Sequence, residues 1–304
     1  MNNNNNNNVK ETRKNRNKRV FWQIVTWCGL ALVLFSLYNR YNQNKFDNEK
    51  QQIVQKMEKE NSEKMEKANA KIEENRAQLI VANNKKKETD EKIKKLKESE
   101  AVKFALKEEK IAKTFKEFTK MSSDVIAYVE IPNLEIEEPI CKTKDNSYYL
   151  RKNLLGQYYE NGTAFVEQNN KTDFTDDNTV IYHHNMLKEG VDFSSLYKLT
   201  KDGVASKHPY INLYYNNKLH VYKIFSSYMA YPDVDYRSLQ FYDTFDKLDY
   251  LEELYSRSEV KLEKPSFNEN TKIVTLSTCA EEGMRTVVHA ILVEDDSRVA
   301  TIYD

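Results

Sequence analysis

The pattern of hydrophobic and polar positions begins with one long apolar run. Residues 20–38 (VFWQIVTWCGLALVLFSLY) carry no charge, and a helix of about 20 apolar residues is long enough to cross a membrane. Aromatic residues lie where both interfaces would be, at Trp22, Trp27 and Tyr38. No small-x-small cleavage pattern follows the run, as a cleaved signal peptide would require. We therefore expect a transmembrane anchor over 20–38.

A basic cluster from Lys10 to Arg19 precedes this run, and a polyasparagine stretch precedes the cluster. Positive residues mark the cytoplasmic flank of a span. The sequence thus predicts a disordered, basic cytoplasmic tail over 1–19 and a single pass through the cell membrane. Everything after residue 38 is then expected outside the cell.

The next region is strongly polar. Residues 47–131 contain neither glycine nor proline, and lysine, glutamate, asparagine and glutamine dominate. These residues favour helix, whereas the apolar positions keep no regular heptad, so a coiled coil is not expected. We predict an extracellular helical stalk over 39–121 with a break at Asn83-Asn84. Apolar residues at helical spacing near its end predict that it docks on the following domain: Phe104, Ile111, Phe115 and Phe118.

From residue 122 to 304 the pattern changes to short apolar and aromatic segments separated by polar turns. Eight of them read as strands, at 125–131, 138–141, 162–166, 179–182, 210–215, 219–225, 272–278 and 285–293. Eight such strands predict a closed or nearly closed β-barrel. Two amphipathic segments, at 193–198 and 244–257, predict helical insertions.

Composition narrows the function without deciding it. The formal net charge of the 304 residues is zero, with no basic surface signature for nucleic acid. Three distant cysteines, Cys28, Cys141 and Cys279, form no CxxC pair, so neither a zinc site nor a disulfide framework is indicated. The acidic residues form no recognisable ligand pattern. We expect no metal and no cofactor.

Cys279 ends a β-branched strand, and Arg285 opens the next strand. A cysteine attacks carbonyl groups as the thiolate, which a cation on a neighbouring strand can favour. A buried structural cysteine is the alternative at this stage.

Two histidines, His183 and His184, follow another buried-looking strand. The other three, His208, His220 and His289, read as structural or surface residues. A cysteine, a histidine and an arginine at separate strand ends suit thiol-based acyl transfer. The spacing leaves open whether they meet.

Four motifs together resemble the class B sortases: TLSTC (275–279) with Arg285 and VVHA (287–290) after it, VIYxHNM (180–186), DNSYYL (145–150) and a helical insertion over 241–258. The resemblance covers residues 122 to about 294. It implies a mainly β, sortase-like eight-stranded barrel with helical insertions, and the transmembrane helix and the stalk expected from the residue pattern would precede this barrel. The stalk is longer than the linker expected of this class.

The resemblance also implies an activity. A membrane-anchored cysteine transpeptidase of a Gram-positive bacterium would cleave the C-terminal sorting signal of a surface protein. It would then pass the thioacyl intermediate to an amine of a cell-wall precursor. The implied catalytic residues are Cys279, His184 and Arg285, and the implied substrate-binding residues are Ser277, Thr278, Tyr182 and Asn146. His183 stands where the family usually has glycine, and it competes with His184 for the catalytic role.

Other functions remain open. A pilin-polymerising sortase would use a lysine as the acceptor. A cysteine peptidase or wall hydrolase would pass the acyl group to water, although such folds commonly present the cysteine at a helix N-terminus. A stalked surface adhesin would not need Cys279 at all.

Overall fold

The computed structural model describes residues 4–81, 86–132, 134–186, 191–279 and 283–293. The chain divides into two compact units, Met1–Asn48 and Glu49–Asp304. Helix α1 (Asn4–Val81) begins in the first unit and continues into the second.

In the first unit, residues 4–19 are helical although the sequence suggested disorder. No glycine or proline interrupts them, and their lysines and arginines tolerate helix well. Large apolar side chains stay exposed further along, including Trp22, Trp27 and Phe35. Over the residues that the structure describes, no helix is apolar enough for long enough to cross a membrane. The span over 20–38 stays a prediction.

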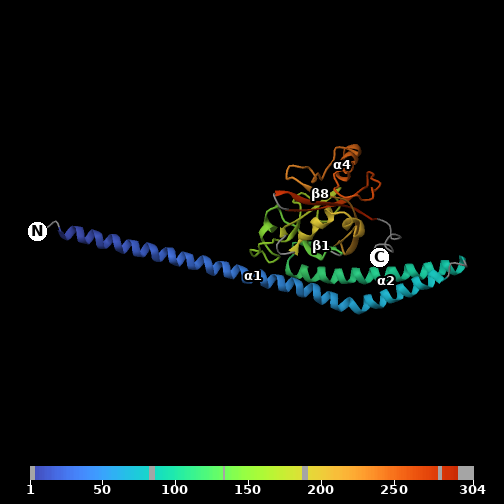
Figure 1. Ribbon diagram of the computed structural model, residues 1–304, viewed down its shortest axis with the longest axis horizontal. Coiled ribbons are helices and arrows are strands. Elements are labelled where there is room, and N and C mark those ends of the chain that lie inside the picture. Colours follow the sequence, from blue (N-terminus) through green and yellow to red (C-terminus); the bar gives the residue numbers. More distant parts are fainter. Residues whose placement is uncertain (1–3, 82–85, 133, 187–190, 280–282, 294–304) are drawn as a thin grey trace. The chain divides into compact units, whose positions relative to one another are not determined.

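In the second unit, the rest of α1 pairs with α2 (Lys86–Met121). The two helices run antiparallel, because Lys64 contacts Glu109 at 3.2 Å whereas Asn75, further along α1, donates to the earlier Ser99 at 2.8 Å. The predicted break at Asn83-Asn84 lies outside the described residues. The stalk segment therefore turns back on itself, and α2 lies along the outside of the barrel (Figure 1).

Eight strands close into a barrel in the order β1-β2-β3-β4-β9-β10-β8-β7, which confirms the predicted barrel (Figure 1). Their bounds are β1 Val125–Ile131, β2 Ile136–Cys141, β3 Ala164–Val166, β4 Asn178–His183, β7 Tyr210–Tyr215, β8 Lys218–Ala230, β9 Ile273–Cys279 and β10 Arg285–Leu292. Neighbours are antiparallel except β2 with β3 and β4 with β9.

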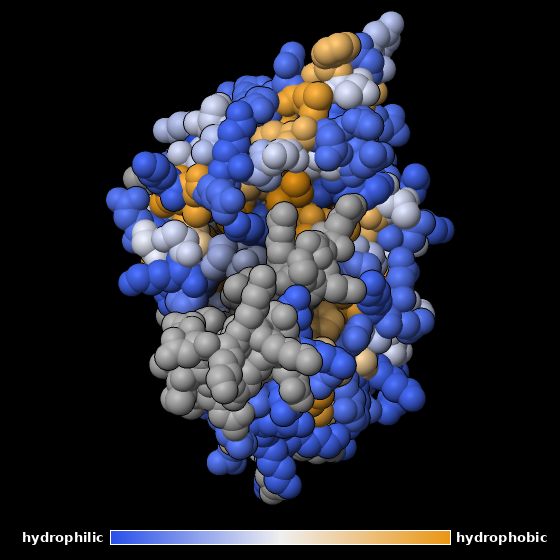
Figure 2. Space-filling model, turned by 90° about the vertical axis from the view of Figure 1, so that its right-hand side faces the viewer, coloured by the Kyte–Doolittle hydropathy of each residue, from blue (hydrophilic) through white to orange (hydrophobic). Residues whose placement is uncertain are grey.

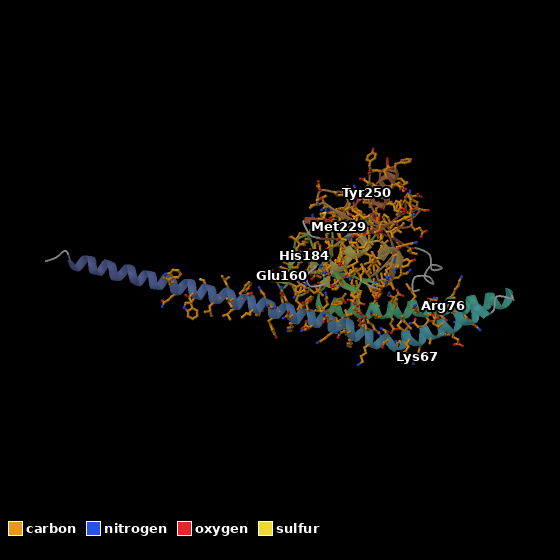
Figure 3. The ribbon with its side chains drawn as sticks, viewed as in Figure 1. Lys67, Arg76, Glu160, His184, Met229 and Tyr250 are labelled. Atoms are coloured by element: carbon orange, nitrogen blue, oxygen red, sulfur yellow. The ribbon has the colours of Figure 1, made fainter. Side chains whose placement is uncertain are left out.

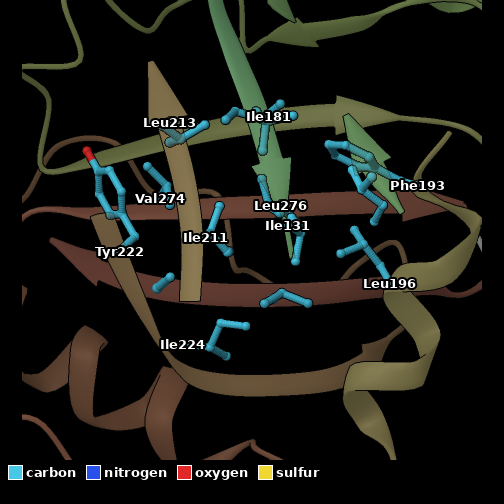
Figure 4. Close-up of a cluster of buried hydrophobic side chains, with 14 of the residues drawn as sticks. Ile131, Ile181, Phe193, Leu196, Ile211, Leu213, Tyr222, Ile224, Val274 and Leu276 are labelled. Atoms are coloured by element: carbon cyan, nitrogen blue, oxygen red, sulfur yellow. The ribbon is translucent and has the colours of Figure 1, made fainter. Parts of the chain in front are cut away.

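The barrel interior is filled by alternate residues of these strands, since successive side chains point to opposite faces. Ile131, Ile181, Leu213 and Leu276 meet there with less than 2% of their surface exposed (Figure 4). At about 25 cal/mol per Å² of buried apolar surface, such a core is the main stabilising term. On the face in Figure 2, hydrophilic residues cover most of the surface and hydrophobic ones form separate patches.

The remaining elements cover the barrel. The predicted docking of the last stalk helix is confirmed, because Phe118 of α2 stacks on Tyr128 and Phe115 contacts Tyr214. Helix α4 (Thr244–Ser256) forms the second predicted insertion, and the Asp243 carboxylate caps it by accepting from the Asp246 N–H at 2.9 Å. The other elements are the 3₁₀ helices η1 Tyr148–Arg151 and η2 Phe193–Thr200, helix α3 Val204–Lys207, and the small sheet of β5 Asn185–Met186 and β6 Val191–Asp192.

Candidate active site

Three strands bring the predicted catalytic positions to one end of the barrel. Strands β4 and β9 are parallel neighbours with His183 opposite Thr278, so both carboxyl ends lie together. Strand β10 runs antiparallel to β9 and starts at this end, with Arg285 opposite Cys279. Adjacent strands lie about 4.8 Å apart. The side chain of Cys279 lies outside the described residues, so its position is that of the backbone at the end of β9.

A cavity of about 460 Å³ opens at this end. Seven residues named from the sequence line it: Asn146, Tyr182, His183, His184, Ser277, Thr278 and Arg285. Other lining residues were not predicted from the sequence, among them Glu167, Tyr236, Arg237 and Leu239. The last three come from the segment between β8 and α4, and no local motif links that segment to the site.

The two adjacent histidines have different surroundings. The side chain of His183 is 1% exposed and meets the ring of Phe193 edge-on at 5.2 Å. His184 is half-buried and lines the cavity, and its Nε2 lies 2.6 Å from the carbonyl oxygen of Leu150. Because a carbonyl oxygen only accepts, Nε2 donates in this contact. Figure 3 labels His184 on the barrel, away from Lys67 and Arg76, which lie on the part of α1 that pairs with α2.

One wall of the cavity is organised around the carboxylate of Glu167. Its Oε2 accepts from Asn146 Nδ2 at 2.6 Å and from the Tyr182 hydroxyl at 2.8 Å. Burial, followed by the nearby Glu167 charge and this hydrogen bond, raises the pKa of Tyr182. Tyr182 therefore stays a neutral donor over the ordinary pH range, and the carboxylate fixes both side chains.

Beneath the cavity, a buried polar network joins β9 to the segment after β8. The hydroxyls of Ser277 and Tyr236 lie 2.9 Å apart. Two residues earlier on β9, Thr275 contacts Nδ1 of His289 at 2.9 Å, and Tyr228 contacts its Nε2 at 3.1 Å. Complete burial, reinforced by the Arg257 charge, lowers the pKa of His289 to about 3. His289 is thus a structural residue, one of the two roles expected for it.

Arg285 is half-buried and directs Nη1 toward two backbone carbonyls of the preceding turn, Gly283 at 2.9 Å and Met284 at 3.2 Å. A guanidinium has five donors, so these contacts orient the group without exhausting its donors.

Cys141 is a buried free thiol at the end of β2, and burial raises its pKa. A buried, protonated thiol is a poor nucleophile. Over the described ranges, no group of three or more His, Cys, Asp or Glu residues is arranged to hold a metal ion.

Comparisons with known proteins agree with this geometry. The family model of the sortase domain matches residues 129–293. The chain is similar to sortase B of Listeria monocytogenes, with 33% identity over 169 residues, 55% of this chain and 67% of that protein.

Solved structures extend the similarity. A mutant form of Clostridium perfringens sortase B is 25% identical, with a TM-score of 0.57, and the match covers 62% of this chain and 90% of that one. A sortase B structure from Bacillus anthracis, determined in complex with AAEK1, is 28% identical with a TM-score of 0.55, covering 60% of this chain and 85% of that one.

Proposed function

This chain belongs to the sortase family, and we propose that it is a membrane-anchored enzyme that cleaves the C-terminal sorting signal of surface proteins and joins them to an amine of a cell-wall precursor. At the level of the family, it is a class B sortase and a cysteine transpeptidase. The observation that carries the finer proposal is the cavity where β4, β9 and β10 meet, lined by a half-buried histidine and an arginine.

In the proposed first step, the Cys279 thiolate attacks the carbonyl carbon of the scissile peptide bond. Negative charge develops on the carbonyl oxygen, and the Arg285 guanidinium stabilises it. The C–N bond then breaks as His184 donates a proton to the leaving amine, and the acyl group stays on sulfur as a thioester.

In the second step, the amine of the acceptor attacks the thioester. His184 takes a proton from this amine, the C–S bond breaks, and a new amide forms while the thiolate returns. The acyl group thus passes from one amine to another without net consumption of water.

We assign the proton transfers to His184 rather than His183 on accessibility. A general acid or base must come within hydrogen-bond reach of the reacting atoms. Both histidines border the cavity, but the side chain of His183 is 1% exposed and its ring lies against Phe193, whereas His184 is half-buried. Tyr182, Asn146, Ser277 and Thr278 line the same cavity, which supports the proposal that they contact the sorting peptide.

The anchor is proposed on the apolar run alone. Its described side chains stay exposed, Trp27 at 72% and Leu32 at 68%, and continuous exposed apolar surface marks an interaction with a membrane or a partner. We propose a single pass over 20–38, with residues 1–19 in the cytoplasm and the barrel outside the cell.

The test is mass spectrometry of the full-length protein incubated with sorting-signal peptides, with and without an amine acceptor peptide. We expect a thioester adduct on wild type, none on Cys279→Ala, and a ligated product only when acceptor is present. Product formation insensitive to acceptor, with a free carboxylate, would support the peptidase alternative. Because the enzyme class follows from the family, the adhesin alternative falls away. An acceptor peptide taken from a cell-wall precursor and one that carries a pilin lysine would separate the wall and pilin reactions.

A further inference from the structure

Two consecutive glutamates of β2 each bind a lysine from a different helix. Glu137 accepts from Lys110 of α2 at 3.0 Å. Glu138 accepts from Lys50 of α1 with both carboxylate oxygens, at 2.7 and 2.9 Å. Successive strand residues point to opposite faces, so the two ion pairs lie on different sides of the sheet. Glu137 lies beside the Tyr128 hydroxyl at 3.3 Å.

The second ion pair reaches toward the active-site end of the barrel. Oε2 of Glu138 lies 4.0 Å from Nε2 of His183, and these side chains are 8% and 1% exposed. Lys50 itself is 15% exposed. Charges interact more strongly when water is excluded, and removing one partner of a buried ion pair leaves an uncompensated charge. Lys50 therefore holds the Glu138 carboxylate in place beside His183.

His183 connects this contact to the site. Its backbone belongs to β4 and lies opposite Thr278, the residue before Cys279. Its ring is fixed on another side by Phe193. The next residue, His184, lines the cavity. His183 and His184 are consecutive in the chain, so a shift of the His183 backbone would carry the end of β4 and His184 with it.

We propose that Lys50 and Glu138 are positioning residues for the reaction: through His183 they hold the end of β4 where His184 can serve Cys279. The helix that leads from the N-terminal segment thereby contributes to the catalytic geometry. This inference rests on the proposed role of His184, because a protonated His184 ring beside Cys279 also favours the thiolate that iodoacetamide alkylates. A displacement of about 1 Å in a reacting group can cost about 100-fold in rate, so a small shift is enough to be measured.

The experiment follows the reactivity of Cys279 in the full-length protein, without any substrate. Iodoacetamide alkylation is measured from pH 5 to 9, and peptide mass spectrometry separates Cys279 from Cys28 and Cys141. For Lys50→Met and Glu138→Gln, we expect alkylation at pH 7 to slow by roughly 3- to 10-fold. Lys50→Arg should restore most of the rate.

Two comparisons distinguish positioning from general stability. Glu137→Gln breaks the neighbouring ion pair on the other side of the sheet, and it should stay within about twofold of wild type. In a His183→Gly background, Lys50→Met should slow alkylation no further, because the connecting residue is already gone. Thermal unfolding of each variant verifies that it is folded at the assay temperature.

Three results would overturn the inference: wild-type alkylation in Lys50→Met, equal slowing in Glu137→Gln, or additive effects of Lys50→Met and His183→Gly. His184→Ala tests the premise separately. If it leaves alkylation unchanged, the proposed role of His184 fails and the inference fails with it. If it slows alkylation while Lys50→Met does not, only the inference fails.

Discussion

His289 makes the stability of the barrel depend on pH. It is completely buried between β9 and β8, with Thr275 on one ring nitrogen and Tyr228 on the other. Burial lowers its pKa from 6.5 to about 3. Between these values the unfolded chain binds a proton that the folded chain does not. His289 therefore costs no stability above about pH 7, and stability is lost as the pH falls from about 6.5 toward 3.

The magnitude follows from the shift. Each pH unit in this window removes about 1.4 kcal/mol from the free energy of unfolding. At pH 5, about 1.5 units below the unfolded pKa, the loss due to His289 is about 2 kcal/mol. In His289→Gln this part of the pH dependence should disappear, whatever the substitution costs at neutral pH.

The assay is urea unfolding of the full-length protein at pH 7.5 and pH 5. Both tryptophans, Trp22 and Trp27, precede the barrel, so near-ultraviolet circular dichroism of the tyrosines is the suitable signal. His208→Gln is the matched control, because it removes another half-buried histidine and keeps His289. The control should retain the loss of about 2 kcal/mol that His289 causes. An unchanged pH difference in His289→Gln would refute the reasoning.

Two further predictions concern the site. His184→Asn should lower the rate of thioester formation by about 1000-fold, as loss of a general acid does. His183→Asn should lower the same rate by no more than about tenfold. Single-turnover mass spectrometry measures both rates, and the reverse order would make His183 the catalytic residue. Gly162→Ala should destabilise the barrel by at least about 2 kcal/mol. Gly162 has φ +67, and an added Cβ would lie 2.3 Å from the carbonyl oxygen of Tyr149 and 2.7 Å from that of Leu150. Since Leu150 also contacts His184, this variant should lose activity before it unfolds, and a fully active, equally stable variant would contradict this.

Much of the fold was predictable because it depends on local pattern. Strand alternation located all eight barrel strands, and β-branched segments separated by polar turns indicated closure. The small sheet of β5 and β6 was missed, since strands of two residues leave no periodicity. The segment near Phe193 was expected to be a helix and is a 3₁₀ helix, because hydrophobic spacing does not distinguish the two.

The proposed nucleophile, arginine and histidine come from short motifs, since each motif lies within one strand end. The choice between His183 and His184 could not be made from the sequence. It depends on which face of β4 turns toward Phe193 and Glu138, and these residues belong to other elements. The same holds for Glu167, which acts on Asn146 and Tyr182 across the cavity wall.

By itself, the sequence determined the elements, the barrel class and the family, because hydrophobic period, residue propensity and contiguous motifs are properties of neighbouring residues. Only the tertiary structure decided that β4 lies parallel to β9 with His183 opposite Thr278, and that Lys50 of α1 contacts Glu138 of the barrel. Those contacts join residues far apart in the chain. Their strength comes from burial and from the exclusion of water, which no local pattern records.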